Sequence, residues 1–124
     1  MFKDTPAFSS FSVDDLAKAK AFYGDTLGLP VADLNGQLSL SLAGGGSVFV
    51  YHKRNHTPAT FTILNFRVAN IDQAVAELVQ RGITFERYPN LLHDAQGILR
   101  PDEGPFIAWF KDPAGNILSV LQDR

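Results

Sequence analysis

The chain offers few residues for metal binding or nucleophilic chemistry, because it has three histidines and no cysteine. His52 and His56 are four residues apart, a spacing that on a helix places two imidazoles on one face. They fall instead at a strand end and in a linker that contains Pro58, which favours two exposed loop histidines over a metal pair. His93 and Asp94 could form an acid–base pair, but neighbouring residues seldom point at one substrate atom. The histidines therefore predict no reactive centre by themselves.

Polar residues on the expected strand 61–68 are better candidates for ligand binding. Alternation places Ile63, Asn65 and Arg67 on one face of that strand. Asn65 and Arg67 can then donate hydrogen bonds to a ligand, while for Arg67 a position in solvent or a pairing with an acidic residue stays open. Ser119 has no histidine partner that the sequence identifies, and a lone serine is not an activated nucleophile.

Aromatic residues supply the rest of the expected ligand site. Phe8, Phe49, Tyr51 and Trp109 lie in expected strands and can line an apolar pocket, as small-molecule sites usually require. Ser10 shares its strand face with Phe8. The alternative, that these rings simply fill the interior of the protein, stays open.

These candidates are carried by a unit of strand, helix and further strands that occurs twice in the chain. Sliding the first copy onto the second by 55 residues places Phe11 on Phe66 and Asp15 on Asn70. Both Asp15 and Asn70 can cap a helix, since each accepts a hydrogen bond from the free N–H groups of the first turn. The repeat predicts two modules of the same topology.

The expected elements follow from hydrophobic periodicity and turn residues. In the first half they are strand 7–13, helix 15–27 closed by Gly28, and strands 31–34, 37–42 and 47–52, with Asn35-Gly36 as the hairpin turn between the first two of these strands. In the second half they are strand 61–68, helix 71–81 closed by Gly82, strand 83–87, and a last hairpin of strands 106–110 and 116–122. The loop 88–105 has a length that often covers a site. We expect one domain made of two modules, about 5–55 and 60–124, joined by a polar linker.

Composition limits the classes of function. The apolar fraction of 45% and the charged fraction of 19% are typical of a soluble globular protein. The net charge is −2 and no basic run occurs, so nucleic-acid binding lacks its electrostatic basis. No apolar run approaches the roughly 20 residues of a membrane span, and the start lacks the apolar core of a signal peptide. We therefore expect a cytoplasmic protein that binds neither nucleic acid nor membrane.

Two motifs resemble the vicinal oxygen chelate superfamily, which includes glyoxalase I, extradiol dioxygenases, fosfomycin-modifying enzymes and bleomycin-resistance proteins. The first is Val-x-Asp-Leu from Val13, followed by Phe-Tyr-x-x-x-Leu-Gly-Leu from Phe22. The second is Asp-Pro-Ala-Gly-Asn, which begins at Asp112 in the last hairpin. The resemblance covers nearly the whole chain. It implies an α+β fold of two βαβββ modules, with a curled mixed sheet around a cavity, and a homodimer.

The resemblance also implies positions for the divalent metal that enzymes of this superfamily hold with His, Gln or Glu. These positions fall on Phe8, Ile63 and Ser119, with Phe49 or Tyr51 at the fourth. Phenylalanine and isoleucine have no lone pair to offer, and serine is a poor ligand for such metals. We expect no metal and no cofactor at this site.

The leading hypothesis is a metal-free protein that binds an apolar or aromatic small molecule, with the loop 88–105 as a lid. The ligand-binding candidates are Phe8, Ser10, Phe49, Tyr51, Ile63, Asn65, Arg67, Trp109 and Ser119. One alternative is a metal-dependent glyoxalase-like lyase, isomerase or dioxygenase whose ligands lie elsewhere. The other is a structural or regulatory scaffold with a filled cavity. The residues favour an absence of metal-dependent catalysis and leave open whether any reaction is catalysed.

Overall fold

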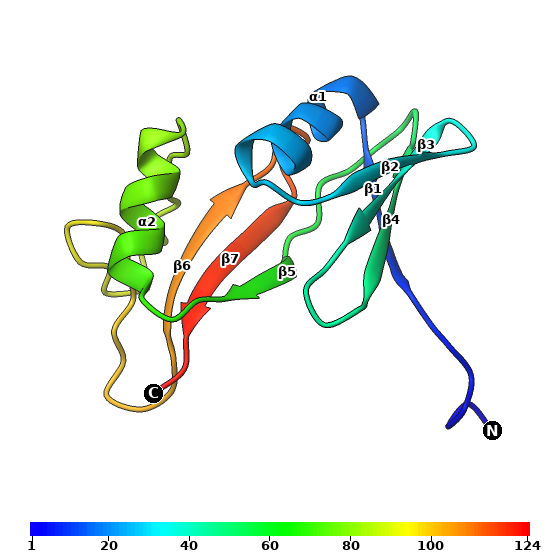
Figure 1. The fold of residues 1–124 in the computed structure, drawn as a ribbon. Helices are drawn as coiled ribbons and strands as arrows, with labels where there is room; N and C mark the ends of the chain where they lie inside the picture. The colour runs from blue at the N-terminus through cyan, green and yellow to red at the C-terminus, as the bar shows by residue number, and fades with distance from the viewer. The chain divides into compact units, whose positions relative to one another are not determined.

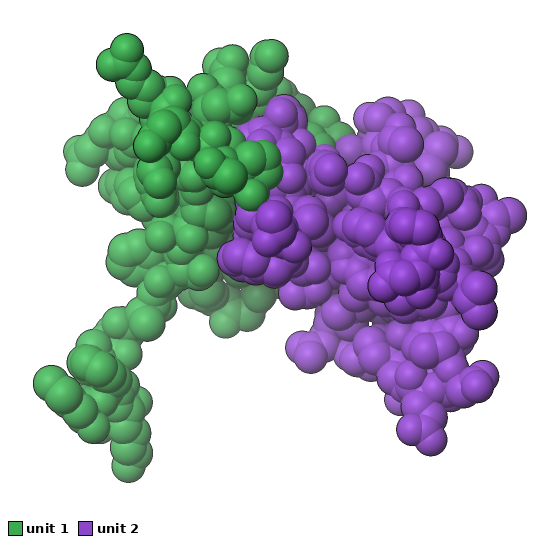
Figure 2. Space-filling view, turned by 180° about the vertical axis from the view of Figure 1, so that it is seen from behind, with its two compact units in different colours: residues 1–58 green, residues 59–124 purple.

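The computed structural model describes all of residues 1–124, which form two compact units. Unit 1 is Met1–Pro58 and unit 2 is Ala59–Arg124, coloured separately in Figure 2. The boundary between the units falls inside the polar linker 53–60. The two helices are each too short to span a membrane.

Unit 1 contains one four-stranded sheet and one helical segment (Figure 1). Its elements are β1 (Ser9–Val13), α1 (Leu16–Lys20), the π-helical turn η1 (Ala21–Thr26), β2 (Val31–Leu34), β3 (Gln37–Ser41) and β4 (Ser47–His52). The strand order is β1-β4-β3-β2, with β1 parallel to β4 and the other neighbours antiparallel.

The first helical segment, residues 16–26, lies within one residue of the predicted bounds 15–27 at each end, but its second half is π-helical. The side chain of Asp15 accepts a hydrogen bond from the Lys18 N–H at 3.0 Å, so the predicted cap is confirmed. The helix then opens into η1, where the Leu27 N–H bonds to the carbonyl of Phe22, five residues back, at 2.9 Å. Gly28 ends the segment with a φ of +77°, a conformation that glycine adopts without steric cost.

The core of unit 1 lies between this helical segment and one face of the sheet. The strands contribute Leu38, Leu40, Val48 and Val50, all of them buried. Tyr23 is fully buried and packs against Phe11 of β1, with ring centroids 5.6 Å apart. Because side chains alternate along a strand, the residues between these core positions point to the opposite face of the sheet, which we call the open face of unit 1.

Unit 2 repeats this arrangement with three regular strands. Its elements are β5 (Thr62–Arg67), α2 (Ile71–Gln80), β6 (Phe106–Lys111) and β7 (Ile117–Gln122). The strand order is β5-β7-β6, with β5 parallel to β7 as β1 is to β4. Asn70 caps α2 by accepting a hydrogen bond from the Gln73 N–H at 3.1 Å, as the repeat predicts. Ile71, Val75, Phe110, Leu118 and Val120 form the buried core.

The predicted strand 83–87 is wrong, because only one bridge forms there. Phe85 bridges Phe110, and the Glu86 N–H bonds to the carbonyl of Trp109 at 2.8 Å. Nearer the start of β6, Ile107 is bridged by Leu99, and the two residues exchange two backbone hydrogen bonds. Leu99 of the loop 88–105 thus pairs with part of the β6 edge along which a regular strand 83–87 would have to pair.

The architecture is α+β, with two α-helices and seven strands in two mixed sheets, neither of which closes on itself. The predicted α+β fold class is therefore confirmed, and the second module lacks one of the three strands expected after its helix. The strands belong to two separate sheets, one in each unit, in place of one continuous curled sheet.

Candidate functional site

The open face of unit 1 carries a set of aromatic side chains, which we call the aromatic face: Phe8, Phe49 and Tyr51. The parallel register pairs Ser10 with Phe49 and Ser12 with Tyr51, so these two serines share the face with the rings. The rings of Phe8 and Phe49 meet edge to face at 6.5 Å between centroids, and those of Phe49 and Tyr51 stack at 6.0 Å. The structure thus brings together the four candidates that the sequence placed in the first module.

The aromatic face is exposed within unit 1. Phe8 is 70% exposed, and Phe49 and Tyr51 are only half-buried, whereas the core residues next to them are almost fully buried. Large aromatic rings that gather on an accessible face mark a candidate surface for binding an apolar molecule.

A groove of about 360 Å³ lies at one end of the aromatic face. Its lining residues are Phe8, Leu34, Asn35, Gln37, Ser39, Ser47 and Phe49. Five of these lining residues were not among the residues predicted for the site: Leu34, Asn35, Gln37, Ser39 and Ser47. The signal was present in the alternation of polar and apolar residues along β3, which puts Gln37 and Ser39 opposite the buried leucines.

A serine and a histidine meet on the open face of unit 1. Ser12 Oγ lies 2.6 Å from His56 Nδ1. His56 is half-buried by this contact, so the prediction that it is an exposed loop residue is wrong, while His52 is exposed as predicted. His52 uses its backbone N–H to bond Gln37 Oε1 at 2.8 Å. The two imidazoles therefore have separate environments within unit 1.

One face of the sheet of unit 2 brings together Asn65, Ser119 and Trp109. The register pairs Ser119 with Asn65 on one side and with Trp109 on the other. Ser119 Oγ, which is fully buried, donates a hydrogen bond to Asn65 Oδ1 at 2.5 Å. Asn65 itself is exposed, so its amide nitrogen can donate to a ligand.

A β-bulge in β5 changes which residue lies next to Trp109. The pairing of β5 with β7 shifts between Thr62 and Leu64, which leaves Ile63 as an extra residue in the strand. Trp109 Nε1–H donates to Thr62 Oγ1 at 3.2 Å. The strict alternation that predicted Ile63 and Asn65 on one face of β5 is therefore interrupted. Thr62, and not Ile63, lies beside Trp109.

Trp109 is also packed against two side chains of the loop 88–105. The rings of Tyr88 and His93 lie 5.5 Å and 6.0 Å from its ring, each edge to face. Burial, followed by the nearby Glu86 carboxylate, raises the pKa of Tyr88 above its ordinary value, so this phenol is protonated at neutral pH.

Hydrogen bonds fix the tautomer of His93. Its Nδ1–H donates to the Gly97 carbonyl at 2.8 Å, because a carbonyl can only accept. Its Nε2 accepts from the Tyr88 N–H at 3.0 Å. The carboxylate of Asp94 is bound to the N–H groups of Gln96 and Ile98. Both nitrogens of His93 and the carboxylate of Asp94 thus have structural partners, which argues against an acid–base pair.

Arg67 pairs with an acidic residue, which is the alternative that the sequence left open. Its Nε–H donates to Asp123 Oδ2 at 2.8 Å, with both side chains largely exposed.

The positions that the resemblance implies for a divalent metal do not fit one. Phe8, Phe49 and Ile63 offer no donor atom, and Ser119 Oγ already donates its proton to Asn65. No three His, Asp or Glu side chains come close enough to hold a metal ion. The donor set is that of a surface for apolar or hydrogen-bonded molecules.

The Asp-Pro-Ala-Gly-Asn motif has a structural role in the last hairpin. Asp112, which is buried, accepts hydrogen bonds from the N–H groups of Ala114 and Asn116, and from the Asn116 side chain at 3.0 Å. Asn116 Oδ1 in turn accepts from the Ala59 N–H. This network holds the turn between β6 and β7 and the start of unit 2.

The loop 88–105, which the sequence suggested as a lid, is anchored to unit 2 at several points. Ile98 is fully buried, and Leu99 is paired with β6. Arg100 bonds Asp94 and Asp72, at 3.1 and 2.6 Å. These contacts make the loop a fixed wall beside Trp109.

A family model described as the Glyoxalase/Bleomycin resistance protein/Dioxygenase superfamily matches residues 8–120. The uncharacterized protein YraH of Bacillus subtilis is 25% identical over 125 residues, covering 89% of this chain and 91% of YraH.

Solved structures of the same fold include two proteins linked to antibiotics. TnmS3, an antibiotic binding protein from a Streptomyces species, has a TM-score of 0.72 and 25% identity, with 98% of each chain covered. The fosfomycin resistance protein FosX from Listeria monocytogenes has a TM-score of 0.74 at 12% identity, covering 98% of this chain and 94% of FosX. At that identity the likeness to FosX shows the fold alone.

Proposed function

Since the chain belongs to the glyoxalase/bleomycin resistance protein/dioxygenase superfamily, we propose that it binds an aromatic or largely apolar small molecule without a catalytic metal. The observation that carries this proposal is the aromatic face of unit 1, where Phe8 and Phe49 line a groove of about 360 Å³ and Tyr51 stacks on Phe49 beside it.

The size and chemistry of the groove favour a ligand over a filled scaffold. Small-molecule sites usually measure about 300–1,000 Å³ and combine an apolar lining with a few polar groups. Here the rings of Phe8 and Phe49 supply the apolar surface, and Gln37 and Ser39 supply the polar groups. A scaffold of purely structural function would gain stability by burying such rings, and within unit 1 they stay accessible.

TnmS3 gives independent support for binding in place of catalysis. It is described as an antibiotic binding protein and is similar to this chain over almost its whole length. We extend to this chain only the general property of small-molecule binding, with the chemical class of ligand taken from the aromatic face.

A metal-dependent lyase, isomerase or dioxygenase is the second candidate. It is disfavoured by the donor set, because the implied ligand positions carry phenylalanine, isoleucine and a serine that is already hydrogen-bonded.

The test is a titration of the ¹⁵N-labelled protein with a panel of small aromatic compounds, followed by NMR. We expect saturable shifts at the amides of β3 and β4. Phe49→Ala and Tyr51→Ala should each weaken binding by about tenfold, since one aromatic contact is worth about 1.5 kcal/mol. Phe61→Ala removes another exposed ring, at the start of unit 2, and should leave the affinity unchanged. Equal affinity in all three variants would refute the aromatic face as the site.

The metal-free state is tested separately by metal content and by thermal melting with Zn²⁺, Ni²⁺, Mn²⁺ and Fe²⁺ under reducing conditions. A ligand that binds only the folded state raises the melting temperature. We expect no bound metal and no shift. About one metal per chain, or a clear upward shift, would support the metalloenzyme instead.

A further inference from the structure

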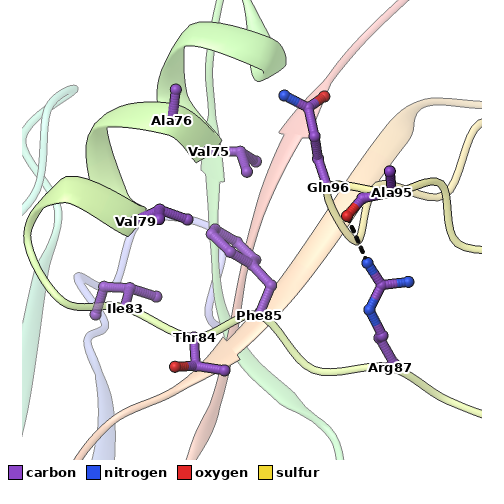
Figure 3. Close-up of a pocket in the computed structure, with 9 residues that line it drawn as sticks. All are labelled: Val75, Ala76, Val79, Ile83, Thr84, Phe85, Arg87, Ala95 and Gln96. Carbon is purple, nitrogen blue, oxygen red and sulfur yellow. Dashed lines mark hydrogen bonds between the residues drawn. The ribbon is translucent and has the colours of Figure 1, made fainter.

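A second groove lies in unit 2, on the side of its sheet that α2 covers (Figure 3). It measures about 490 Å³ and is bounded by α2, by the segment 83–87 and by the loop residues 95 and 96. We call it the helix groove. Its lining residues are Val75, Ala76, Val79, Ile83, Thr84, Phe85, Arg87, Ala95 and Gln96. It shares no residue with the aromatic face of unit 1.

One side of the helix groove is apolar. Figure 3 shows the ring of Phe85 below Val75 and Val79, which project from α2. Val79 is 54% exposed, an unusual exposure for a large aliphatic side chain on a helix that packs on a sheet. An apolar molecule that lies on these residues would remove this surface from water.

The wall opposite α2, formed by the loop residues 95 and 96, is held in place by the close approach of Gly97 to Phe85 and by hydrogen bonds to the Asp94 side chain. Gly97 has a φ of +90°, and a β-carbon there would lie 3.2 Å from Cβ of Phe85. A side chain at residue 97 would crowd Phe85 and strain the backbone at this positive φ, so glycine favours the close approach of the loop. The Asp94 carboxylate also binds the N–H groups of Gln96 and Ile98, which fixes the turn. The groove is thus largely formed before a ligand enters.

The polar side of the helix groove carries a cation without an acidic partner. Arg87 Nη2 donates to the Ala95 carbonyl at 2.7 Å, the contact drawn in Figure 3, and no salt bridge includes Arg87. The nearby carboxylates have other cations as partners: Glu77 pairs with Arg81, Glu86 with Lys111 and Asp94 with Arg100. The remaining N–H groups of the Arg87 guanidinium form a planar fork that suits a carboxylate.

We propose that the helix groove is a second small-molecule site, selective for compounds that combine an apolar body with a carboxylate. The apolar body lies on Val75, Val79 and Phe85, and the carboxylate binds Arg87. The volume is within the range of small-molecule sites, and the single unpaired cation sets the charge of the ligand.

The test uses the ¹⁵N-labelled protein and three probes that share one ring system: 1-naphthoate, 1-naphthalenemethanol and 1-naphthylmethylamine. We expect 1-naphthoate to shift the amides of Val79, Thr84 and Gln96. The neutral and cationic probes should bind there at least about tenfold more weakly, because a hydrogen bond to a charged group is lost. Shifts confined to β3 and β4 would overturn this proposal while supporting the aromatic face.

Four variants separate the charge from the shape of the groove. Arg87→Leu should weaken 1-naphthoate binding in the groove about tenfold, and Arg87→Lys, which keeps the charge but not the planar fork, should weaken it less. Ala76→Phe fills the groove from an exposed helix position and should abolish binding. Arg54→Leu makes the same change of net charge in the linker and should have no effect.

The proposal is overturned if 1-naphthoate leaves the groove amides unchanged, if the three probes bind there equally, or if Ala76→Phe binds as the wild type does. Because Arg87 also holds the loop through Ala95, Arg87→Leu could fail to fold. The comparison of probes and the Ala76→Phe variant then decide the question without it.

Discussion

The carboxylate of Asp112 holds the turn between β6 and β7 in unit 2. It accepts hydrogen bonds from two backbone N–H groups and from the Asn116 amide while buried from water. A charged acceptor at this position satisfies several buried donors of a tight turn at once.

We predict that Asp112→Ala lowers the free energy of unfolding by about 2–3 kcal/mol, since it leaves buried donors without an acceptor. Asp102→Ala, at an exposed loop position, is the control and should change it by less than about 0.5 kcal/mol. Urea unfolding at neutral pH measures both. Similar values for the two variants would show that the hairpin network is not important for stability.

Asp94 predicts a dependence of stability on pH. Burial alone would raise the pKa of Asp94, but hydrogen bonds from the Ile98 N–H, from Arg100 and from the Gln96 N–H together lower it below its ordinary value. The ionised form is therefore favoured in the folded state. Its contribution is fully present above the unfolded pKa of about 3.9 and is lost as the pH falls through the lower folded value.

We expect Asp94→Asn to reduce this acid sensitivity, so that the stability difference between wild type and variant shrinks as the pH is lowered from 5 toward 2. Urea unfolding at a series of pH values measures the difference. A difference that stays constant over this range would mean that Asp94 does not contribute through its charge.

At the level of elements, the loop 88–105 is part of the core of unit 2. Ile98 is fully buried, whereas Leu92 in the same loop is 91% exposed. The sequence suggested a lid because a long loop rich in glycine, proline and aspartate often covers a site. The pairing of Leu99 with β6 and the ion pairs of Arg100 make such a movement costly.

Ile98→Ala should destabilise the protein by about 2–4 kcal/mol, because it leaves a cavity in the core. Leu92→Ala, a matched truncation in the same loop, should have almost no effect. The midpoints of thermal unfolding give the comparison. If Ile98→Ala were as mild as Leu92→Ala, the loop would be loosely attached and could act as a lid after all.

For the whole molecule, the resemblance implies a homodimer. We predict that light scattering coupled to gel filtration gives twice the chain mass of 13.6 kDa. Phe2 and Phe61, which are exposed and lie outside the aromatic face, are surfaces that a second copy can cover. A mass of one chain at micromolar concentration would contradict this prediction.

The sequence by itself determined the repeated module, the two helix caps, the Asn-Gly turn and the last hairpin. These features depend on local rules: Asp15 and Asn70 accept hydrogen bonds within their own first turns, and Asn35-Gly36 has the positive φ angles that such a turn requires. The candidates Phe8, Ser10, Phe49 and Tyr51 also follow from alternation along regular strands.

Only the tertiary structure decided features that join distant parts of the chain. Because of the β-bulge, Thr62 and not Ile63 lies beside Trp109. Leu99 pairs with β6, where a regular strand 83–87 was expected. The partners of His56 and Arg67 are 44 and 56 residues away. Periodicity reports which face a residue occupies but not which residue lies opposite, because that depends on register and on the path of the loops.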